Sequence, residues 1–213
     1  MQVNFTYEKN KDIWCLLNKG KSSNNSQNST KQYEQLIEKY GENPTAETTA
    51  VFVDEYVAEN KIDIPKCIDD FQKDWESISA EFQKRAEAIF DISLPNNITA
   101  HLTINSRCPY SIQDSFFYVS LQSPQAMRTV MHELWHFYTW YGLGADQEEK
   151  LGKQKYNDLK EALTVLLNVE FKDLLPEGIT DTGYPQHQEI REKILEYWEK
   201  DRNINNLWKY LVQ

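Results

Sequence analysis

The sequence predicts an α+β fold that is mostly helical, with a small sheet just before a central helix. Helices are indicated by apolar residues that recur at a spacing near 3.6 over most of the chain. A sheet is indicated after Pro95, where Ile98, Ala100, Leu102 and Ile104 alternate with polar residues. Such alternation is typical of a half-buried strand.

The first half of the chain is expected to be helical after one short strand at residues 3–7. Ser29 or Thr30 can cap a helix that Gly41 ends, and Thr45 can cap the next one. Pro65 is expected to open the third helix, because the first helical position needs no amide hydrogen bond. The third helix is expected over residues 65–89, and the polar stretch 21–29 before the first is expected to be a mobile loop.

The second half is expected to hold the sheet and the remaining helices. Strands at 98–105 and 115–121 are expected to pair as a hairpin with a long loop, giving a small antiparallel-containing sheet packed on the helix that follows. The expected helices are 123–141, 156–171, 186–200 and 203–211. We expect a single domain over 1–213, with a helical N-terminal part (1–90) and a second part (91–213).

Charge and composition limit the partners. The 23 basic and 33 acidic residues give a net charge of −10, which repels a phosphate backbone, so no nucleic-acid partner is expected. No signal-peptide pattern and no apolar run of about 20 residues is present, so no membrane partner is expected. The three cysteines are odd in number and widely spaced, which favours a reducing compartment. We therefore expect a soluble, cytoplasmic protein.

The candidate chemistry lies in the helix expected at 123–141, which is apolar on nearly every side from Val130 onward. In its middle stand His132, Glu133 and His136, and buried polar groups are costly unless something satisfies them. Residues four apart share a helix face, so the two imidazoles can hold one zinc ion. Glu133 points about 100° away from His132. It can take a proton from a zinc-bound water. The simpler alternative is a pair of hydrogen-bonded core histidines with a surface glutamate.

This His-Glu-x-x-His pattern resembles that of the zincin metallopeptidases, over roughly residues 98–191. The resemblance implies a sheet lying over the active-site helix, with an edge strand that holds the backbone of a peptide or protein substrate. Thr139 and Gly142 stand where the metzincin branch has a glycine and a histidine, so that branch is excluded. The similar gluzincins supply their third ligand as a glutamate from a second helix downstream.

Glu161 matches that third ligand, 161 − 136 = 25 positions beyond the second histidine. The gluzincin pattern often has an aspartate four residues later, but this chain has Val165 there. Support for the ligands is therefore expected from Thr164 or Asn168 instead. A solvated glutamate at a helix margin is the simpler interpretation of Glu161. The competing ligands are Asp146, Glu148, Glu149 and His187.

Tyr184 and His187 are the candidates for stabilising the oxyanion that forms on an attacked carbonyl. They lie in a turn that leads into a helix, and in similar zincins a tyrosine or histidine outside the metal motif has this role. The alternative is that Tyr184 only packs and His187 only caps the helix. His101, on the expected strand, is expected to face solvent or form a hydrogen bond rather than bind metal.

The sequence as a whole predicts an intracellular, zinc-dependent metallopeptidase of gluzincin-like design. Three alternatives remain. The first is a zincin-like metal-binding module with a regulatory or interaction role and no peptidase activity. The second is a zinc hydrolase of an amide that is not in a protein. The third is a non-enzymatic helical interaction protein.

Overall fold

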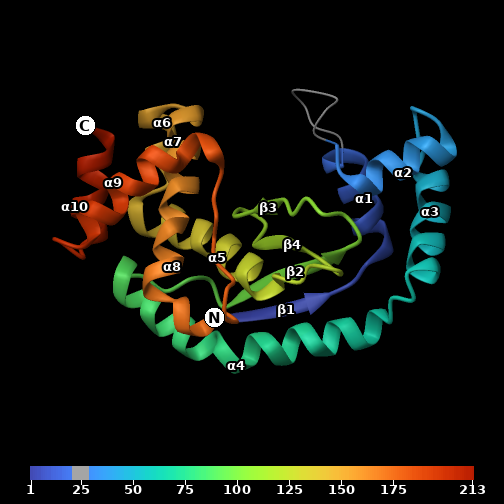
Figure 1. The fold of residues 1–213 in the computed structure, drawn as a ribbon, viewed down its shortest axis with the longest axis horizontal. Coiled ribbons are helices and arrows are strands. Elements are labelled where there is room, and N and C mark those ends of the chain that lie inside the picture. The colour runs from blue at the N-terminus through green and yellow to red at the C-terminus, as the bar shows by residue number, and fades with distance from the viewer. Residues whose placement is uncertain (21–28) are drawn as a thin grey trace. The chain divides into compact units, whose positions relative to one another are not determined.

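Helices make up most of the chain, and one small sheet completes it, so the predicted α+β class is confirmed (Figure 1). The structure, a computed structural model, describes residues 1–20 and 29–213. The loop expected at 21–29 lies almost entirely outside the described residues. The described residues form two compact units. We call residues 2–75 and 96–126 the sheet unit, and Met1, 76–95 and 127–213 the helical unit.

The sheet of the sheet unit is mixed, and its described strands stand in the order β1-β2-β4-β3. The central strand β2 pairs in parallel with both β1 and β4, whereas β3 pairs antiparallel with β4. The bounds are β1 Gln2–Thr6, β2 Asn97–Thr103, β3 Tyr110–Ser111 and β4 Phe116–Ser120.

The expected hairpin between the strands at 98–105 and 115–121 is wrong, because these strands, β2 and β4, run parallel. The segment between them forms β3, and β3 is the antiparallel partner of β4. Burial explains the difference. Phe117 to Ser120 are all buried, as in strands covered on both faces, which is usual for parallel pairs. Alternation in β2 indicated a strand but carried no information about its direction.

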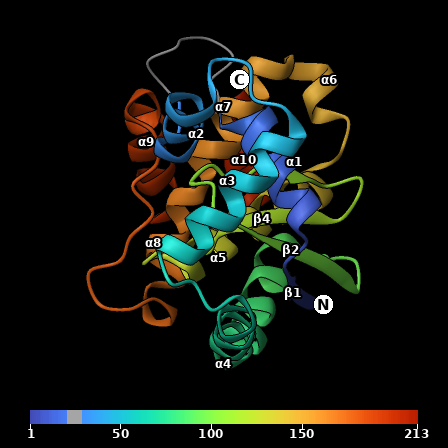
Figure 2. The ribbon, with the colours of Figure 1, turned by 90° about the vertical axis from the view of Figure 1, so that its right-hand side faces the viewer.

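Helices α1, α2 and α3 complete the sheet unit, together with the first part of α4. Figure 2 shows α1 lying alongside α3, and α1 also contacts β2. The predicted caps are confirmed: the Thr30 side chain accepts a hydrogen bond from the amide of Tyr33, and Thr45 forms a capping box with Thr48. The bounds are α1 Lys9–Lys19, α2 Lys31–Tyr40, α3 Ala46–Glu59 and α4 Ile64–Phe90.

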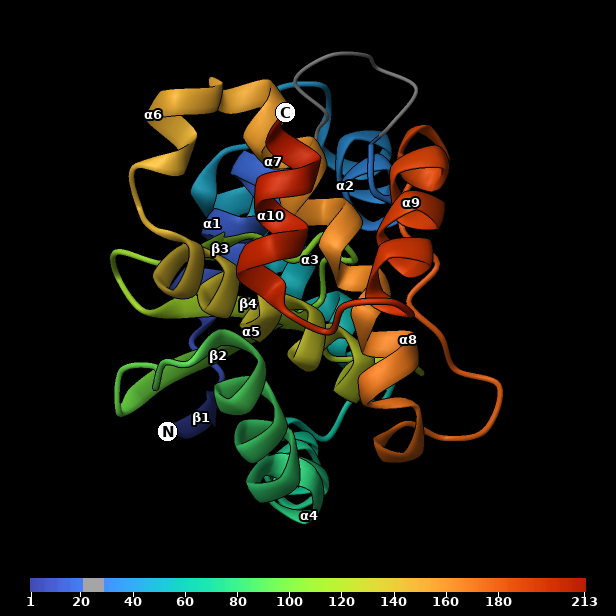
Figure 3. The same ribbon diagram turned by 90° about the vertical axis from the view of Figure 1, so that its left-hand side faces the viewer.

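The helical unit is built on α5, which is buried nearly all round as predicted. Met131, Leu134 and Trp135 are fully buried, and the Trp135 ring meets Phe90 of α4 at a centroid distance of 4.9 Å. Figure 3 shows α9 beside α7 and α10, and it contacts both. The helices are α5 Ala126–Leu143, α6 Gln147–Leu151, α7 Lys153–Leu163, α8 Leu167–Glu170, α9 Gln188–Trp198 and α10 Ile204–Val212.

Two details of this unit differ from expectation. The segment between the helices expected at 123–141 and 156–171 contains the short helix α6. The helix expected at 156–171 is divided into α7 and α8 by a 3₁₀ turn at Thr164–Leu166. In the described residues, no helix combines the length and the apolar character that crossing a bilayer requires.

Candidate metal centre

His132 and His136 project from the same face of α5, as their spacing of four requires. The centroids of the two imidazole rings are 4.6 Å apart, and the rings lie edge to face. His136 is only 1% exposed. The predicted pair of histidines therefore lies on the buried central helix of the helical unit.

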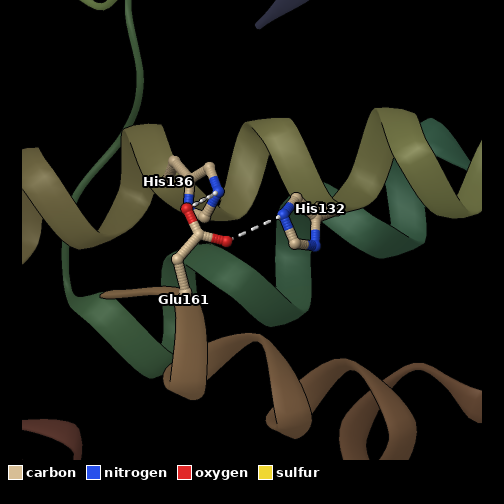
Figure 4. A group of neighbouring side chains, drawn as sticks. All are labelled: His132, His136 and Glu161. Atoms are coloured by element: carbon tan, nitrogen blue, oxygen red, sulfur yellow. Dashed lines mark ion pairs between the residues drawn. The ribbon is translucent and has the colours of Figure 1, made fainter. Parts of the chain in front are cut away.

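Glu161 reaches these histidines from α7 (Figure 4). Its Oε2 lies 3.5 Å from Nε2 of His132, and its Oε1 lies 3.3 Å from Nε2 of His136. One ligand atom from each of the three residues lies within 4.8 Å of the other two. A tetrahedral zinc site with bonds near 2.1 Å separates its ligand atoms by about 3.4 Å. The two distances start from different oxygens of Glu161, and each is close to that spacing.

Two imidazole nitrogens and one carboxylate are also a donor set that catalytic zinc takes in proteins. The competing ligands do not join this group in the described part of the chain. Those competitors are Asp146, Glu148, Glu149 and His187. Of the third-ligand candidates considered from the sequence, Glu161 is the one that lies with the two histidines.

Asp181 is the residue of the site that the sequence did not single out. Its Oδ2 accepts a hydrogen bond from Nδ1 of His132 at 2.7 Å, so that Nε2 of His132 faces Glu161. Metal-binding histidines commonly donate their other ring N–H to a carboxylate, which sets the tautomer and the ring orientation. An aspartate two positions before a glycine resembles an ordinary turn residue, so local sequence offered no signal for this contact.

Asp181 is itself held in place and is 1% exposed. Its Oδ1 accepts hydrogen bonds from Oγ1 of Thr164 at 2.9 Å and from Arg191 at 3.1 Å. The Asn168 side chain exchanges two hydrogen bonds with the Asp181 backbone. Thr164 and Asn168, expected to support the ligands, thus contact Asp181. Thr164 is also hydrogen-bonded to the backbone carbonyl oxygen of Glu161, at 2.7 Å.

Glu133 follows His132 on α5 and is 6% exposed. Its Oε2 has no hydrogen-bond partner among the described residues. Burial raises the pKa of Glu133 to about 7, although the positive charge of His132 opposes the rise. Glu133 is therefore a buried carboxyl group that can take up and release a proton near neutral pH.

The two histidines differ in their affinity for a proton. Burial lowers the pKa of His132, but the carboxylates of Asp181 and Glu161 outweigh it and raise that pKa to about 10. Burial holds the pKa of His136 well below its ordinary value, and the Lys160 ammonium lowers it further. His132 therefore carries a proton between two carboxylates in the metal-free protein. A cation bound at Nε2 would take the place of that proton.

Tyr184 and His187 have different environments. His187 is buried, and its Nε2 lies 3.0 Å from Oδ1 of Asp158, which precedes Glu161 by three positions on α7. Tyr184 is 52% exposed and packs edge to face against His187, with the ring centroids 5.6 Å apart. His187 is thus hydrogen-bonded one helical turn from Glu161.

His101 belongs to the sheet unit. Its Nδ1 lies within hydrogen-bond distance, 3.3 Å, of Oγ1 of Thr6. His101 is not part of the metal-binding group in the described residues.

No family model, curated protein or solved structure matches this chain. The functional interpretation therefore rests on the chemistry of the cluster formed by His132, His136 and Glu161, with Glu133 and Asp181 beside it.

Proposed function

We propose that this protein is a zinc-dependent metallopeptidase of gluzincin-like design. The observation that carries the proposal is the cluster of His132, His136 and Glu161, whose ligand atoms lie within 4.8 Å of one another. Three protein ligands leave one coordination position open, as in catalytic rather than structural zinc sites. The contact between Asp181 and His132 supports the same proposal, since it is the support that a metal-binding histidine needs.

In this proposal each polar residue has a defined task. His132, His136 and Glu161 hold the ion, and Asp181 orients the His132 ring. Bound zinc would supply a Lewis acid that polarises the substrate carbonyl and acidifies a water molecule. Glu133 takes a proton from the attacking water as its oxygen bonds to the carbonyl carbon. Glu133 then gives that proton to the amine nitrogen as the carbon–nitrogen bond breaks.

His187 is proposed to stabilise the negative charge that develops on the carbonyl oxygen, with Asp158 orienting its ring. Tyr184, which packs against His187 at the surface, is proposed to assist. A polarising cation together with a base is what water needs to attack an amide carbonyl, which is consistent with a peptide or protein substrate. The net charge of −10 is consistent with a substrate other than nucleic acid.

The experiment combines metal analysis with a matched pair of variants. Purified protein should contain about one zinc per chain. It should also cleave members of a quenched-fluorescence peptide library. Glu133→Gln should keep the zinc and lose cleavage by roughly 10²- to 10⁴-fold. The control, Glu149→Gln, changes an exposed residue of α6 and should keep both properties.

Three results would contradict the proposal. The metal site is rejected if elemental analysis finds no zinc and metal-stripped protein takes none up. Zinc binding without cleavage of any library member would favour a metal-binding module over a peptidase. Loss of zinc from Glu133→Gln would make Glu133 a ligand and exclude it as the base.

A further inference from the structure

Lys160 is a buried charged residue of α7 that the mechanism above does not use. It is 4% exposed, although lysine is almost never fully buried unless its charge is paired. Its Nζ forms an ion pair with Oε1 of Glu161 at 3.3 Å. A buried ammonium therefore lies against the carboxylate that is proposed to bind the metal.

The two carboxylate oxygens of Glu161 consequently have different surroundings. Oε1 lies 3.3 Å from both the ammonium of Lys160 and Nε2 of His136. Oε2 lies 3.5 Å from Nε2 of His132 and has no hydrogen-bond partner among the described residues. The contact of Oε2 with His132 is too long to be a good hydrogen bond, so Oε2 is the less tightly held of the two oxygens and the one more available to a cation.

We propose that Lys160 is a positioning residue that holds Oε1 and leaves Oε2 as the one oxygen that Glu161 gives to the metal. This inference rests on the proposed zinc site. An ammonium and a divalent cation repel each other, which disfavours their sharing one oxygen. A carboxylate bound through one oxygen fills one coordination position. With the two histidines it leaves the fourth position open for the reaction.

The test uses Co²⁺ as a probe, because its visible absorption is intense in four-coordinate sites and weak in five- or six-coordinate ones. Co²⁺-loaded wild-type protein should show the intense bands. Lys160→Met removes the charge and nearly keeps the length of the side chain. Both oxygens of Glu161 are then free to bind, so the bands should weaken. Lys160→Arg should keep the intense bands. Lys153→Met, an exposed position on the same helix, should match the wild type.

Zinc affinity and turnover separate positioning from a structural role. Because Lys160→Met removes a positive charge beside the ion, its zinc affinity should be equal to or higher than that of the wild type. Its kcat on the peptide library should fall roughly 10- to 100-fold, the usual effect of removing a group that supports a metal ligand. KM should change less than kcat, because Lys160 does not touch the substrate.

Unchanged Co²⁺ bands in a folded Lys160→Met variant would overturn the inference and leave the zinc site intact. Failure of the wild type to take up Zn²⁺ or Co²⁺ would reject the proposed function and this inference with it. If Lys160→Met does not fold, the zinc-loaded wild-type structure decides. Oε2 alone bonded to zinc supports the inference, whereas both oxygens bonded to zinc overturns it.

Discussion

Oδ2 of Asp181 and Nδ1 of His132 lie 2.7 Å apart, although the two residues are 49 positions apart in the chain. The hydrogen bond leaves Nε2 of His132 facing Glu161. Arg191, which is 3% exposed, donates to the other side of the same carboxylate. Asp181 therefore joins the buried guanidinium of Arg191 to the partly buried imidazole of His132, and it sets the direction of one candidate metal ligand.

Asp181→Ala should weaken both the metal site and the fold. Without the carboxylate, the His132 ring loses its orienting partner, and zinc affinity should fall roughly 10- to 100-fold. The buried charge of Arg191 also loses a partner, which should lower the free energy of unfolding by about 3–5 kcal/mol. Chelator competition and urea unfolding measure the two effects. Asp146→Ala breaks an exposed ion pair with Lys150 and an exposed hydrogen bond from Gln147, and should cost less than about 1 kcal/mol.

Gly183→Ala should disturb the same network through the backbone. Gly183 has a φ of +62°, and a Cβ there would lie 2.5 Å from Nη1 of Arg191. The variant should lose roughly 1–3 kcal/mol of stability and bind zinc more weakly, because Arg191 must move away from Asp181. Gly178 is a matched control, since its φ is +81° but a Cβ would meet nothing within 4 Å.

Gly178→Ala should therefore lose only the stability that a non-glycine residue costs at a positive φ, and its zinc affinity should be unchanged. Equal effects of the two substitutions on stability and on metal binding would show that the contact with Arg191 has no role. Thermal unfolding with and without zinc provides the comparison.

Glu161→Ala should lower zinc affinity by more than the roughly 10- to 100-fold expected for supporting residues, because a direct ligand is lost. Glu161→Asp should lower it less, since the carboxylate remains but is withdrawn by one methylene. Competition with a chromogenic chelator measures both. Glu148→Ala tests a competing ligand and should leave the affinity unchanged. The reverse pattern would transfer the third-ligand role from Glu161 to Glu148.

Asp12 should make stability depend on pH independently of the metal site. It is fully buried in the sheet unit and accepts hydrogen bonds from Tyr7, Thr103 and the amide of Ile104. Burial raises its pKa from 3.8 to about 6, although these hydrogen bonds oppose the rise. The folded protein thus holds this proton more tightly than the unfolded chain. The resulting stability is present below pH 3.8 and is lost as the pH rises through about 6.

Between pH 4 and pH 7, the wild type should therefore lose up to about 2–3 kcal/mol of stability relative to Asp12→Asn, which cannot ionise. Urea unfolding at a series of pH values measures the difference. Asp54→Asn, which removes an exposed ion pair with Lys9, should give a curve parallel to the wild type. A parallel curve for Asp12→Asn as well would mean that Asp12 is not the responsible group.

The features that the sequence predicts well depend on short-range geometry. A spacing of four places His132 and His136 on one face of any α-helix, whatever surrounds it. The caps at Thr30 and Thr45 involve only the next three residues and are confirmed. Glu161 is intermediate. The apolar pattern predicted its helix, a resemblance suggested its proposed role as a ligand, and the structure placed it beside the histidines.

Contacts between segments that are distant in the sequence were decided by the tertiary structure alone. The parallel pairing of β2 and β4, the hydrogen bond from His132 to Asp181 and the ion pair of Lys160 with Glu161 leave no periodic trace in the sequence. Alternation in a strand reports which face is buried but not which way its neighbour runs. An aspartate in a turn looks the same whether it faces water or a histidine. Local geometry therefore determined the candidate ligands on α5, and long-range packing decided what surrounds and orients them.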